Sequence, residues 1–277
     1  RTLVPADALA MSGALDYGGL AVLVDAWDRY GLDGVLCRAG TPRQRALLKA
    51  MVLGRLLFPS SKLALSEQAE GTLLAKACGL KPDEGFDEDD LYEAMDALSG
   101  EWVGTEKALY ARAFQGSVQL VLYDLTSVYF EGKGPFGISR YGHSRDHRKD
   151  RPQVLLAVAT DAEGLPIHIE VLRGNRTDNT TLQSLLVTLR RRFGIRAATF
   201  VFDGGMSSRL NLETMTKDSL IFVTRLSSAT LGALLEASET QLQMELGDST
   251  RVMEIEHEGK RYVIAGGVWS RQRDQER

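Results

Sequence analysis

The change of hydrophobic periodicity near Ser117 is the sequence feature that most constrains the fold. Before this residue, apolar side chains recur at the spacing of amphipathic helices, as at Leu20, Leu23, Val24 and Trp27. After it, short apolar runs bounded by turn residues are interrupted by helical patterns. The expected order is strand, strand, strand, helix, strand, helix, strand. This order predicts an α/β fold with a mixed sheet flanked by helices.

The sequence therefore divides into three expected parts. Residues 1–116 should form an all-α N-terminal accessory or DNA-binding domain, in which Thr41 and Pro42 predict the start of a helix. Residues 117–230 should form the α/β core. Residues 231–277 begin with a helix-like stretch over 231–243 and continue with two expected strands, RVMEIEHEG and KRYVIAGGVW.

Length and composition argue against a membrane-spanning protein and against a secreted protein built on disulfides. With 277 residues, 44% of them hydrophobic, the chain can bury a sizeable core. It has no signal-peptide pattern and no apolar run long enough to span a bilayer. Its two cysteines lie far apart in the sequence. This spacing excludes a disulfide framework and favours a reduced, cytoplasmic protein with no membrane partner.

The charges are distributed unevenly along the chain. Residues 1–116 hold 12 basic and 17 acidic residues, a net charge of −5. Residues 133–225 hold 15 basic and 9 acidic residues, a net charge of +6. A basic segment inside an acidic chain indicates an anionic partner such as a phosphate backbone. A solvated surface of mixed charge is the alternative interpretation.

Two aspartates occur within or directly after short apolar strands: Asp124 in VLYDLTSVYF and Asp203 in FVFDGG. An uncompensated buried carboxylate is costly, so each needs a cation, several donors or an exposed strand end. If the two strands are neighbours, both carboxylates reach one edge of the sheet. Oxygen ligands that converge there favour Mg²⁺ or Mn²⁺. The alternatives are a pairing of Asp124 with an arginine and an Asx-turn from Asp203 into Gly204.

Three motifs occur in order: LYDLTSVYFEG, YGHSRDHRKDRPQVLLAVATDAEGLPIHIEVLRGNRTDNTTL and ATFVFDGGMSS. Together they resemble the DDE transposases of bacterial insertion sequences, in the group that has an all-β insertion in the catalytic domain. The resemblance implies an RNase H-like core over residues 117–230, with Asp124 and Asp203 as the first two catalytic acids. It also implies a site for two Mg²⁺ or Mn²⁺ ions held by these acids. The implied partner is DNA with terminal inverted repeats, bound by a homodimer.

The third acid of that family is a glutamate on a helix after the β-rich insertion, within a Tyr, Arg, Glu, Lys pattern that this sequence does not show. Residues 231–277 resemble the start of the insertion, so we expect a chain truncated before the third acid. Glu254, Glu256 and Glu258 lie in a strand-like alternation and are poor candidates. Two functions stay open. One is transposition by metal-assisted phosphodiester hydrolysis and strand transfer, and the other is a non-catalytic, DNA-binding remnant.

Basic residues near the aspartates are candidate phosphate ligands. The loop RYGHSRDHRKDR holds Arg145, Arg148 and Lys149, which the resemblance implies to be close to the substrate. Arg173 and Arg176 lie in RGNRTDNTTL, where a strand ends and a helix starts. A solvated loop and a helix cap are the alternative interpretations. Zinc binding by the histidines of the first loop is disfavoured because no cysteine lies nearby.

Two other enzyme classes share part of this pattern. Phosphatases of the haloacid-dehalogenase type use an aspartate after a hydrophobic strand as nucleophile, but a second aspartate usually follows two residues later, where Thr126 stands. A general RNase H-like nuclease would share Asp124 and Asp203 without a need for terminal-repeat DNA. Mg²⁺-dependent cleavage of end-specific DNA would separate a transposase from all of these alternatives.

Overall fold

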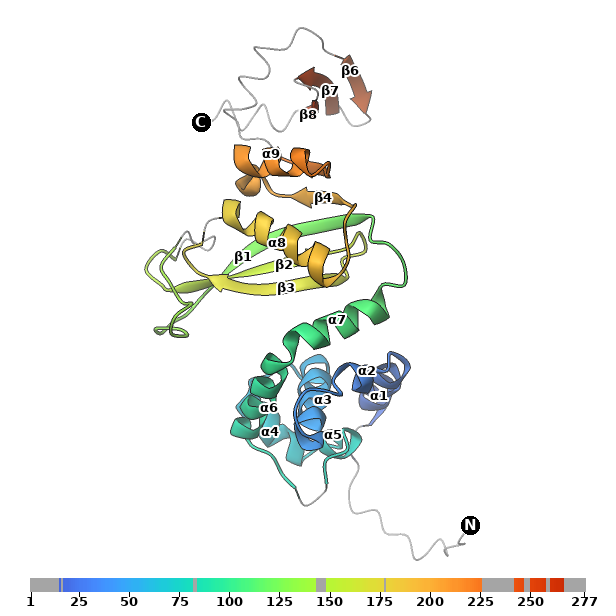
Figure 1. Cartoon of the computed structure of the whole chain (residues 1–277). Helices are drawn as coiled ribbons and strands as arrows, with labels where there is room; N and C mark the ends of the chain where they lie inside the picture. The colour runs from blue at the N-terminus through green and yellow to red at the C-terminus, as the bar shows by residue number, and fades with distance from the viewer. Residues whose placement is uncertain are drawn as a thin grey trace, which may run out of the picture. The chain divides into compact units, whose positions relative to one another are not determined.

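The computed structural model forms two compact units (Figure 1). The first unit joins residues 1–119 to the segments 165–169 and 186–196. The second holds residues 120–164, 170–185 and 197–277. None of the helices in the described part of the chain has the length and apolar sequence needed to cross a bilayer. The described residues are 15, 17–81, 84–142, 148–176, 178–225, 242–246, 250–257 and 260–266.

The first unit is helical over its N-terminal part, so the predicted all-α region is confirmed. Its core consists of apolar side chains at helical spacing, with Leu47, Leu53, Leu74 and Leu91 at most 2% exposed. The helices are α1 (Gly18–Arg29), α2 (Leu32–Val35), α3 (Pro42–Leu57), α4 (Lys62–Glu70), α5 (Leu74–Ala77), α6 (Glu88–Gly100) and α7 (Trp102–Ala113).

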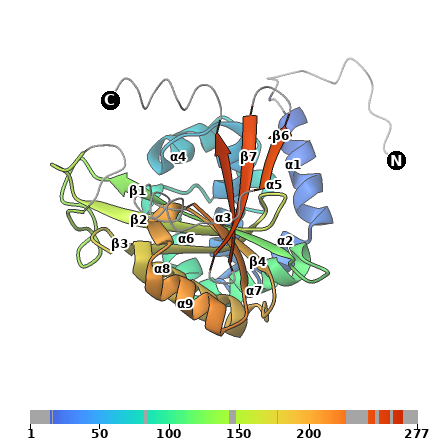
Figure 2. The ribbon, with the colours of Figure 1, turned by 90° about the horizontal axis from the view of Figure 1, so that it is seen from above.

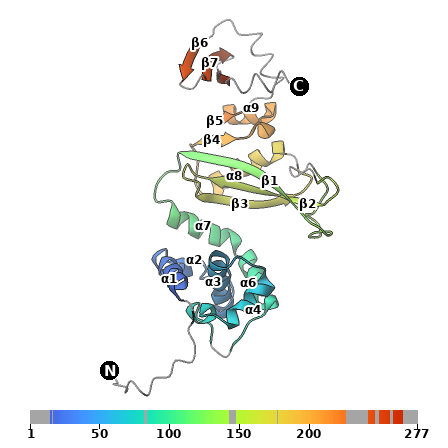
Figure 3. The same ribbon diagram turned by 180° about the vertical axis from the view of Figure 1, so that it is seen from behind.

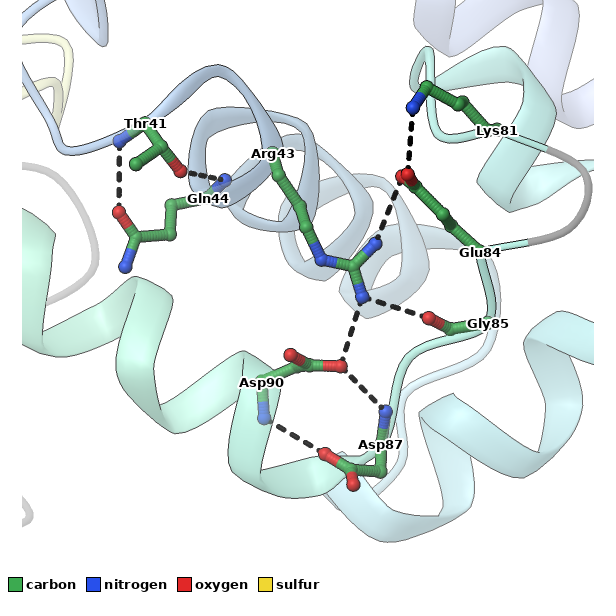
Figure 4. A network of polar contacts seen from close by, with 8 residues as sticks. All are labelled: Thr41, Arg43, Gln44, Lys81, Glu84, Gly85, Asp87 and Asp90. Atoms are coloured by element: carbon green, nitrogen blue, oxygen red, sulfur yellow. Dashed lines mark hydrogen bonds and ion pairs between the residues drawn. The ribbon is translucent and has the colours of Figure 1, made fainter.

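Two of these helices start with reciprocal capping boxes (Figure 4). The Thr41 hydroxyl accepts the Gln44 N–H at 3.2 Å, and the Gln44 side chain accepts the Thr41 N–H at 2.9 Å. Asp87 and Asp90 are paired in the same way at the start of α6. Each box satisfies two N–H groups that the helix leaves without partners. The helix start predicted at Pro42 is therefore confirmed.

Arg43, in the first turn of α3, connects α3 to the segment before α6 (Figure 4). Its Nη2 donates to the Gly85 carbonyl at 2.8 Å and to Asp90 Oδ2 at 3.1 Å. Its Nη1 lies 3.5 Å from Glu84 Oε2, and Lys81 pairs with the other oxygen of that carboxylate at 2.8 Å. The guanidinium thus contacts residues more than 40 positions away.

The described core contains a five-stranded sheet in the order β3-β2-β1-β4-β5. β1 is antiparallel to β2 and parallel to β4, and β4 is parallel to β5. This mixed sheet with flanking helices confirms the predicted RNase H-like α/β fold. Its elements are β1 (Leu120–Tyr129), β2 (Gln153–Thr160), β3 (Pro166–Arg173), α8 (Asp178–Arg192), β4 (Thr199–Phe202), the 3-10 helix η2 (Gly204–Met206), α9 (Arg209–Lys217) and β5 (Ile221–Thr224).

The two faces of the sheet differ in burial. Along β1, Tyr123, Leu125 and Ser127 are buried, whereas Asp124 and Thr126 between them are exposed. The helices α8 and α9 lie side by side (Figures 1 and 2), and the view from behind shows α8 beyond β1 (Figure 3). Right-handed crossovers in one direction along the sheet put both helices on one face. Asp124 therefore lies on the face that the described helices leave open.

A buried carboxylate in α7 joins three elements of the first unit. Glu106 is 5% exposed, and its Oε1 lies 2.7 Å from Nδ1 of His168 in β3. Oε1 also accepts the N–H of Ile169 at 3.2 Å, while Oε2 accepts from Arg192 of α8. The rings of Tyr110 and Phe193 pack nearby, with 4.8 Å between their centroids. Burial alone would raise the pKa of Glu106.

The hydrogen bonds from His168 and Arg192 outweigh that burial, so the pKa of Glu106 lies below its usual value. The carboxylate is therefore ionised at neutral pH and can only accept hydrogen bonds. The proton between it and His168 must then sit on Nδ1. We call Glu106, His168 and Arg192 the buried charge cluster.

A separate three-stranded sheet is built from the C-terminal residues in the order β6-β7-β8. Its strands are β6 (Leu242–Leu246), β7 (Thr250–His257) and β8 (Lys260–Gly266). The two strands expected here are confirmed. The helix-like stretch expected over 231–243 is wrong at its end because Leu242 starts a strand that pairs with Glu254. Residues 226–241 lie outside the described residues.

Candidate active site

Three neighbouring strands align at one end of the sheet. Tyr123 of β1 lies beside Phe202 of β4, and Phe202 lies beside Thr224 of β5. Because neighbouring strands are about 4.8 Å apart, the next row across the three strands spans about 10 Å. That row consists of Asp124, Asp203 and Arg225.

Asp124 can stand in the middle of a strand because its side chain is exposed. The residues on either side of it, Tyr123 and Leu125, are 4% and 1% exposed and fill the opposite face. Its partner in β2 is Val158. A carboxylate on the open face keeps its hydration, so the cost expected for a buried charge does not arise.

Asp203 directly follows β4 and starts the 3-10 helix η2. Its Oδ1 accepts the N–H of Gly204 at 2.7 Å, so the carboxylate caps the 3-10 helix. This hydrogen bond reaches the next residue and not the second one along, as the Asx-turn considered as an alternative would require. A carboxylate has lone pairs on two oxygens, so this hydrogen bond is compatible with binding a cation. The side chain is exposed, as that of Asp124 is.

Both carboxylates line one open pocket of about 460 Å³, which we call the aspartate pocket. Its floor consists of apolar strand residues, and its polar groups come from the row of strand ends and from Thr160. Among the described residues that line it, Arg225 is the one basic side chain. The full lining is Leu122, Tyr123, Asp124, Val158, Thr160, Val201, Phe202, Asp203 and Arg225.

Gly204 lets the ends of β4 and β5 approach closely. A Cβ atom at this position would come within 2.9 Å of the Arg225 carbonyl oxygen. That distance is too short for a side-chain carbon against a backbone atom, so any larger residue would displace one of the two segments. Glycine at position 204 therefore keeps Arg225 beside Asp203.

The donor chemistry of the two aspartates fits Mg²⁺ or Mn²⁺. Mg²⁺ is commonly held by one or two carboxylates, with waters and substrate phosphates as its other ligands. Within the described residues, no group of three or more His, Cys, Asp and Glu side chains is close enough to hold a metal ion. Glu254 pairs with Arg261 at 3.1 Å, and Glu258 lies outside the described residues.

The loop residues predicted to bind phosphate have different surroundings. Arg148 donates to both oxygens of Asp150, at 3.0 and 3.1 Å, and its guanidinium lies 5.1 Å from the centre of the Tyr129 ring. The hydrogen bond from Arg148 holds the pKa of Asp150 below its usual value. Lys149 is exposed in the adjacent turn, and Arg145 lies outside the described residues.

Arg173 and Arg176 lie at the end of β3 and in the following turn. The Arg176 N–H donates to the Arg173 carbonyl at 3.0 Å, and Arg173 is exposed. Gly174 follows Arg173, and its carbonyl accepts a hydrogen bond from the Gln153 side chain at 2.9 Å. Gln153 is the partner of Tyr129 across β1 and β2. Tyr129 is five positions along β1 from Asp124, about 17 Å at the usual strand rise. The described members of the predicted basic set are thus at the far end of β1.

A second open pocket, of about 480 Å³, lies near that end of β1. Three basic residues line it, namely Lys133, Arg140 and Arg151. Arg151 pairs with Glu131 at 3.0 Å. The sequence analysis missed Lys133, which precedes the loop RYGHSRDHRKDR. It also did not single out Arg140 and Arg151, the first and last residues of that loop.

Sequence reasoning also missed Arg225 and Thr160 in the aspartate pocket. The signal for Arg225 was available, because it follows the apolar strand IFVT as Asp203 follows TFVF. Thr160 ends β2 in the row beside Leu122 of β1. That cross-strand position depends on the register of the hairpin, which no local pattern fixes.

The chain is similar to a known protein family over about half of its length. The profile of the family described as "Transposase DDE domain" matches residues 116–265. None of the curated protein sequences compared with the chain matches it.

Two solved structures illustrate the structural comparison. A piggyBac transposase synaptic complex with hairpin DNA has a TM-score of 0.45 and 8% sequence identity, over 90% of this chain and 61% of that chain. A pre-cleavage Mos1 transpososome has a TM-score of 0.28 and 14% identity, over 69% of this chain and 63% of that chain. This chain thus spans about three fifths of the length of either protein.

Proposed function

Because this chain belongs to the transposase DDE domain family, we propose that it acts in the transposition of a bacterial insertion sequence. Its reaction would be hydrolysis of a phosphodiester bond at each end of the element, followed by strand transfer. The observation that carries this proposal is the arrangement of Asp124 and Asp203 on adjacent strands, both exposed in one open pocket.

The chemistry requires two displacements at phosphorus. In the first, water attacks the phosphodiester and a 3′-oxygen leaves as a hydroxyl. In the second, that 3′-hydroxyl attacks a phosphodiester of the target DNA, and another 3′-oxygen leaves. When bound, Mg²⁺ or Mn²⁺ ions activate the attacking oxygen and stabilise the leaving oxygen. Asp124 and Asp203 would hold the ions, and their exposure leaves room for a DNA strand.

The other parts of the chain would bind and orient DNA. Arg145, Arg148, Lys149, Arg173 and Arg176 would contact phosphates away from the reacting bond, since backbone contacts fix the register of a protein on DNA. The helical residues 1–116 would be an accessory DNA-binding region, and 231–277 the start of a β-rich insertion. The partner would be the terminal inverted repeats of the element, held by a homodimer.

A non-catalytic role in DNA binding is the second candidate. It is favoured by the lack of a third acid beside Asp124 and Asp203 among the described residues. A chain of this kind would bind the same DNA ends without cutting them.

The test uses a labelled duplex taken from the DNA that flanks the reading frame of this chain, called here the flanking duplex, with a scrambled duplex as control. We expect preferential binding of the flanking duplex and nicking that requires Mg²⁺ or Mn²⁺. Asp124→Asn and Asp203→Asn should abolish nicking and preserve folding. Preferential binding without nicking would favour the non-catalytic role. Equal binding of the two duplexes would contradict both candidates.

A further inference from the structure

The aspartate pocket contains a basic side chain for which the two displacements give no role. Arg225 directly follows β5 and occupies the third place in the row that begins with Asp124 and Asp203. It lines the same pocket as both carboxylates. One strand spacing, about 4.8 Å, separates its backbone from that of Asp203.

The Arg225 guanidinium is available for a ligand. Its side chain is exposed, and it forms no ion pair or side-chain hydrogen bond within the described part of the chain. Exposure without a partner is not special in itself, because the exposed Arg196 also forms no side-chain contact within the described residues. What distinguishes Arg225 is its place in the pocket beside the two carboxylates. The Arg225 backbone approaches Gly204 closely, because a Cβ atom at position 204 would come within 2.9 Å of the Arg225 carbonyl oxygen.

We infer that Arg225 is a phosphate-binding residue of this pocket, and that it holds the phosphodiester which lies against Asp124 and Asp203. A phosphate between two carboxylates alone would be repelled, whereas a guanidinium beside them offers a planar pair of N–H donors. The three side chains stand in one row, so a strand laid across the strand ends would meet the carboxylates and the arginine at adjacent positions. This inference rests on the proposed function.

The competing explanation is that Arg225 serves as an internal counter-ion for the two aspartates. That explanation predicts a guanidinium paired with one of the carboxylates. No ion pair of Arg225 with Asp124 or Asp203 is formed, although the three residues line one pocket. The arrangement therefore favours an external anion.

The test measures binding of the flanking duplex by fluorescence anisotropy over a range of salt concentrations, with Ca²⁺ present as an oxygen-binding cation. Arg225→Gln should weaken binding roughly tenfold, as expected for loss of a charged hydrogen bond. The plot of log K against log salt has a negative slope. Arg225→Gln should make this slope less steep by about 0.9, the value for one phosphate contact. Arg225→Lys should restore the salt dependence but only part of the affinity. A lysine keeps the positive charge but lacks the paired N–H donors of the planar guanidinium.

Arg196→Gln is the matched control, because Arg196 is an exposed arginine outside the pocket. It should leave the slope unchanged. Equal effects of Arg225→Gln and Arg196→Gln would overturn the inference, since Arg225 would then contribute only to overall charge. A wild-type slope in Arg225→Gln would overturn it as well.

Gly204→Ala supplies a second, independent variant. The added Cβ must displace either the Arg225 backbone or the turn that starts at Asp203. Either shift changes the spacing of Asp203 and Arg225, so this variant should lose affinity and slope as Arg225→Gln does. Wild-type behaviour of Gly204→Ala would contradict the proposed placement of Arg225. Failure of the wild-type chain to distinguish the flanking from the scrambled duplex would instead refute the proposed function itself.

Discussion

The buried charge cluster and the aspartate pocket hold carboxylate charges in opposite ways. Glu106 is 5% exposed, and the protein itself surrounds it with a guanidinium, an imidazole N–H and a backbone N–H. Asp124, within β1, and Asp203, directly after β4, are exposed and line an open pocket. The first carboxylate connects parts of the protein, whereas the other two face solvent and any ligand that enters.

This difference separates stability from function. Removing the charge of Glu106 would leave Arg192 without its counter-ion and the His168 N–H without a charged acceptor, which is costly. Removing the charge of Asp203 would change a solvated group at low cost. We therefore expect Asp203 to contribute little to folding, and the proposed binding of a cation would account for the position of both aspartates in one pocket.

Substitution of the buried acid should produce the largest effect. Glu106→Gln should lower the free energy of unfolding by about 3–5 kcal/mol, because Arg192 and His168 lose their charged partner. Urea unfolding monitored by circular dichroism measures this change. Glu213→Gln, at an exposed helical position, is the control. A loss no larger than that of the control would show that the cluster is not a stabilising element.

Acid should reproduce the same effect in the unmodified chain. The pKa of Glu106 is lower in the folded protein than its usual value of 4.5. Its contribution to stability is therefore complete above that value and is lost as the pH falls through the folded pKa. Unfolding curves recorded from pH 6 down to about pH 3 should show this loss, and Glu106→Gln should show a shallower one. Parallel curves for the two proteins would contradict this assignment.

Arg43 should lie between the two extremes because it is partly exposed and has several partners. Arg43→Gln should cost about 1 kcal/mol, since it removes a small ion-pair network and the hydrogen bond to the Gly85 carbonyl. The same unfolding assay measures this change, and high salt should reduce the difference. A cost as large as that of Glu106→Gln would show that exposure does not separate these sites.

The smallest effect on stability is expected in the pocket. Asp203→Asn should change the free energy of unfolding by less than about 0.5 kcal/mol, because an asparagine oxygen can still accept the Gly204 N–H. Thermal unfolding without added metal measures this change. A loss of several kcal/mol would mean that Asp203 has a structural role like that of Glu106.

Most of the fold could be predicted from the sequence, but fewer of the contacts and positions of the charged side chains could. The order of strands and helices follows from local periodicity, and Asp124 and Asp203 are recognisable because a carboxylate in an apolar strand is unusual. The rule that identified Asp203 would also have identified Arg225. Local rules failed at Leu242, where strand pairing in a small sheet determines the structure.

The buried charge cluster could not be predicted in this way. Glu106 and His168 are separated by 62 positions, and Glu106 and Arg192 by 86. Each residue alone resembles an ordinary helix or strand residue, and only the packing of α7 against β3 and α8 makes them partners. The row across β1, β4 and β5 was predictable because parallel strands bring their ends together, which is a general property of sheets.

Titration of Mn²⁺ by calorimetry tests the central claim most directly. The unmodified chain should bind Mn²⁺, Asp124→Asn and Asp203→Asn should each abolish binding, and Glu213→Gln should bind as the unmodified chain does. Binding that survives in both aspartate variants, or a folded unmodified chain that binds no Mn²⁺, would contradict the claim that these two carboxylates form a metal site.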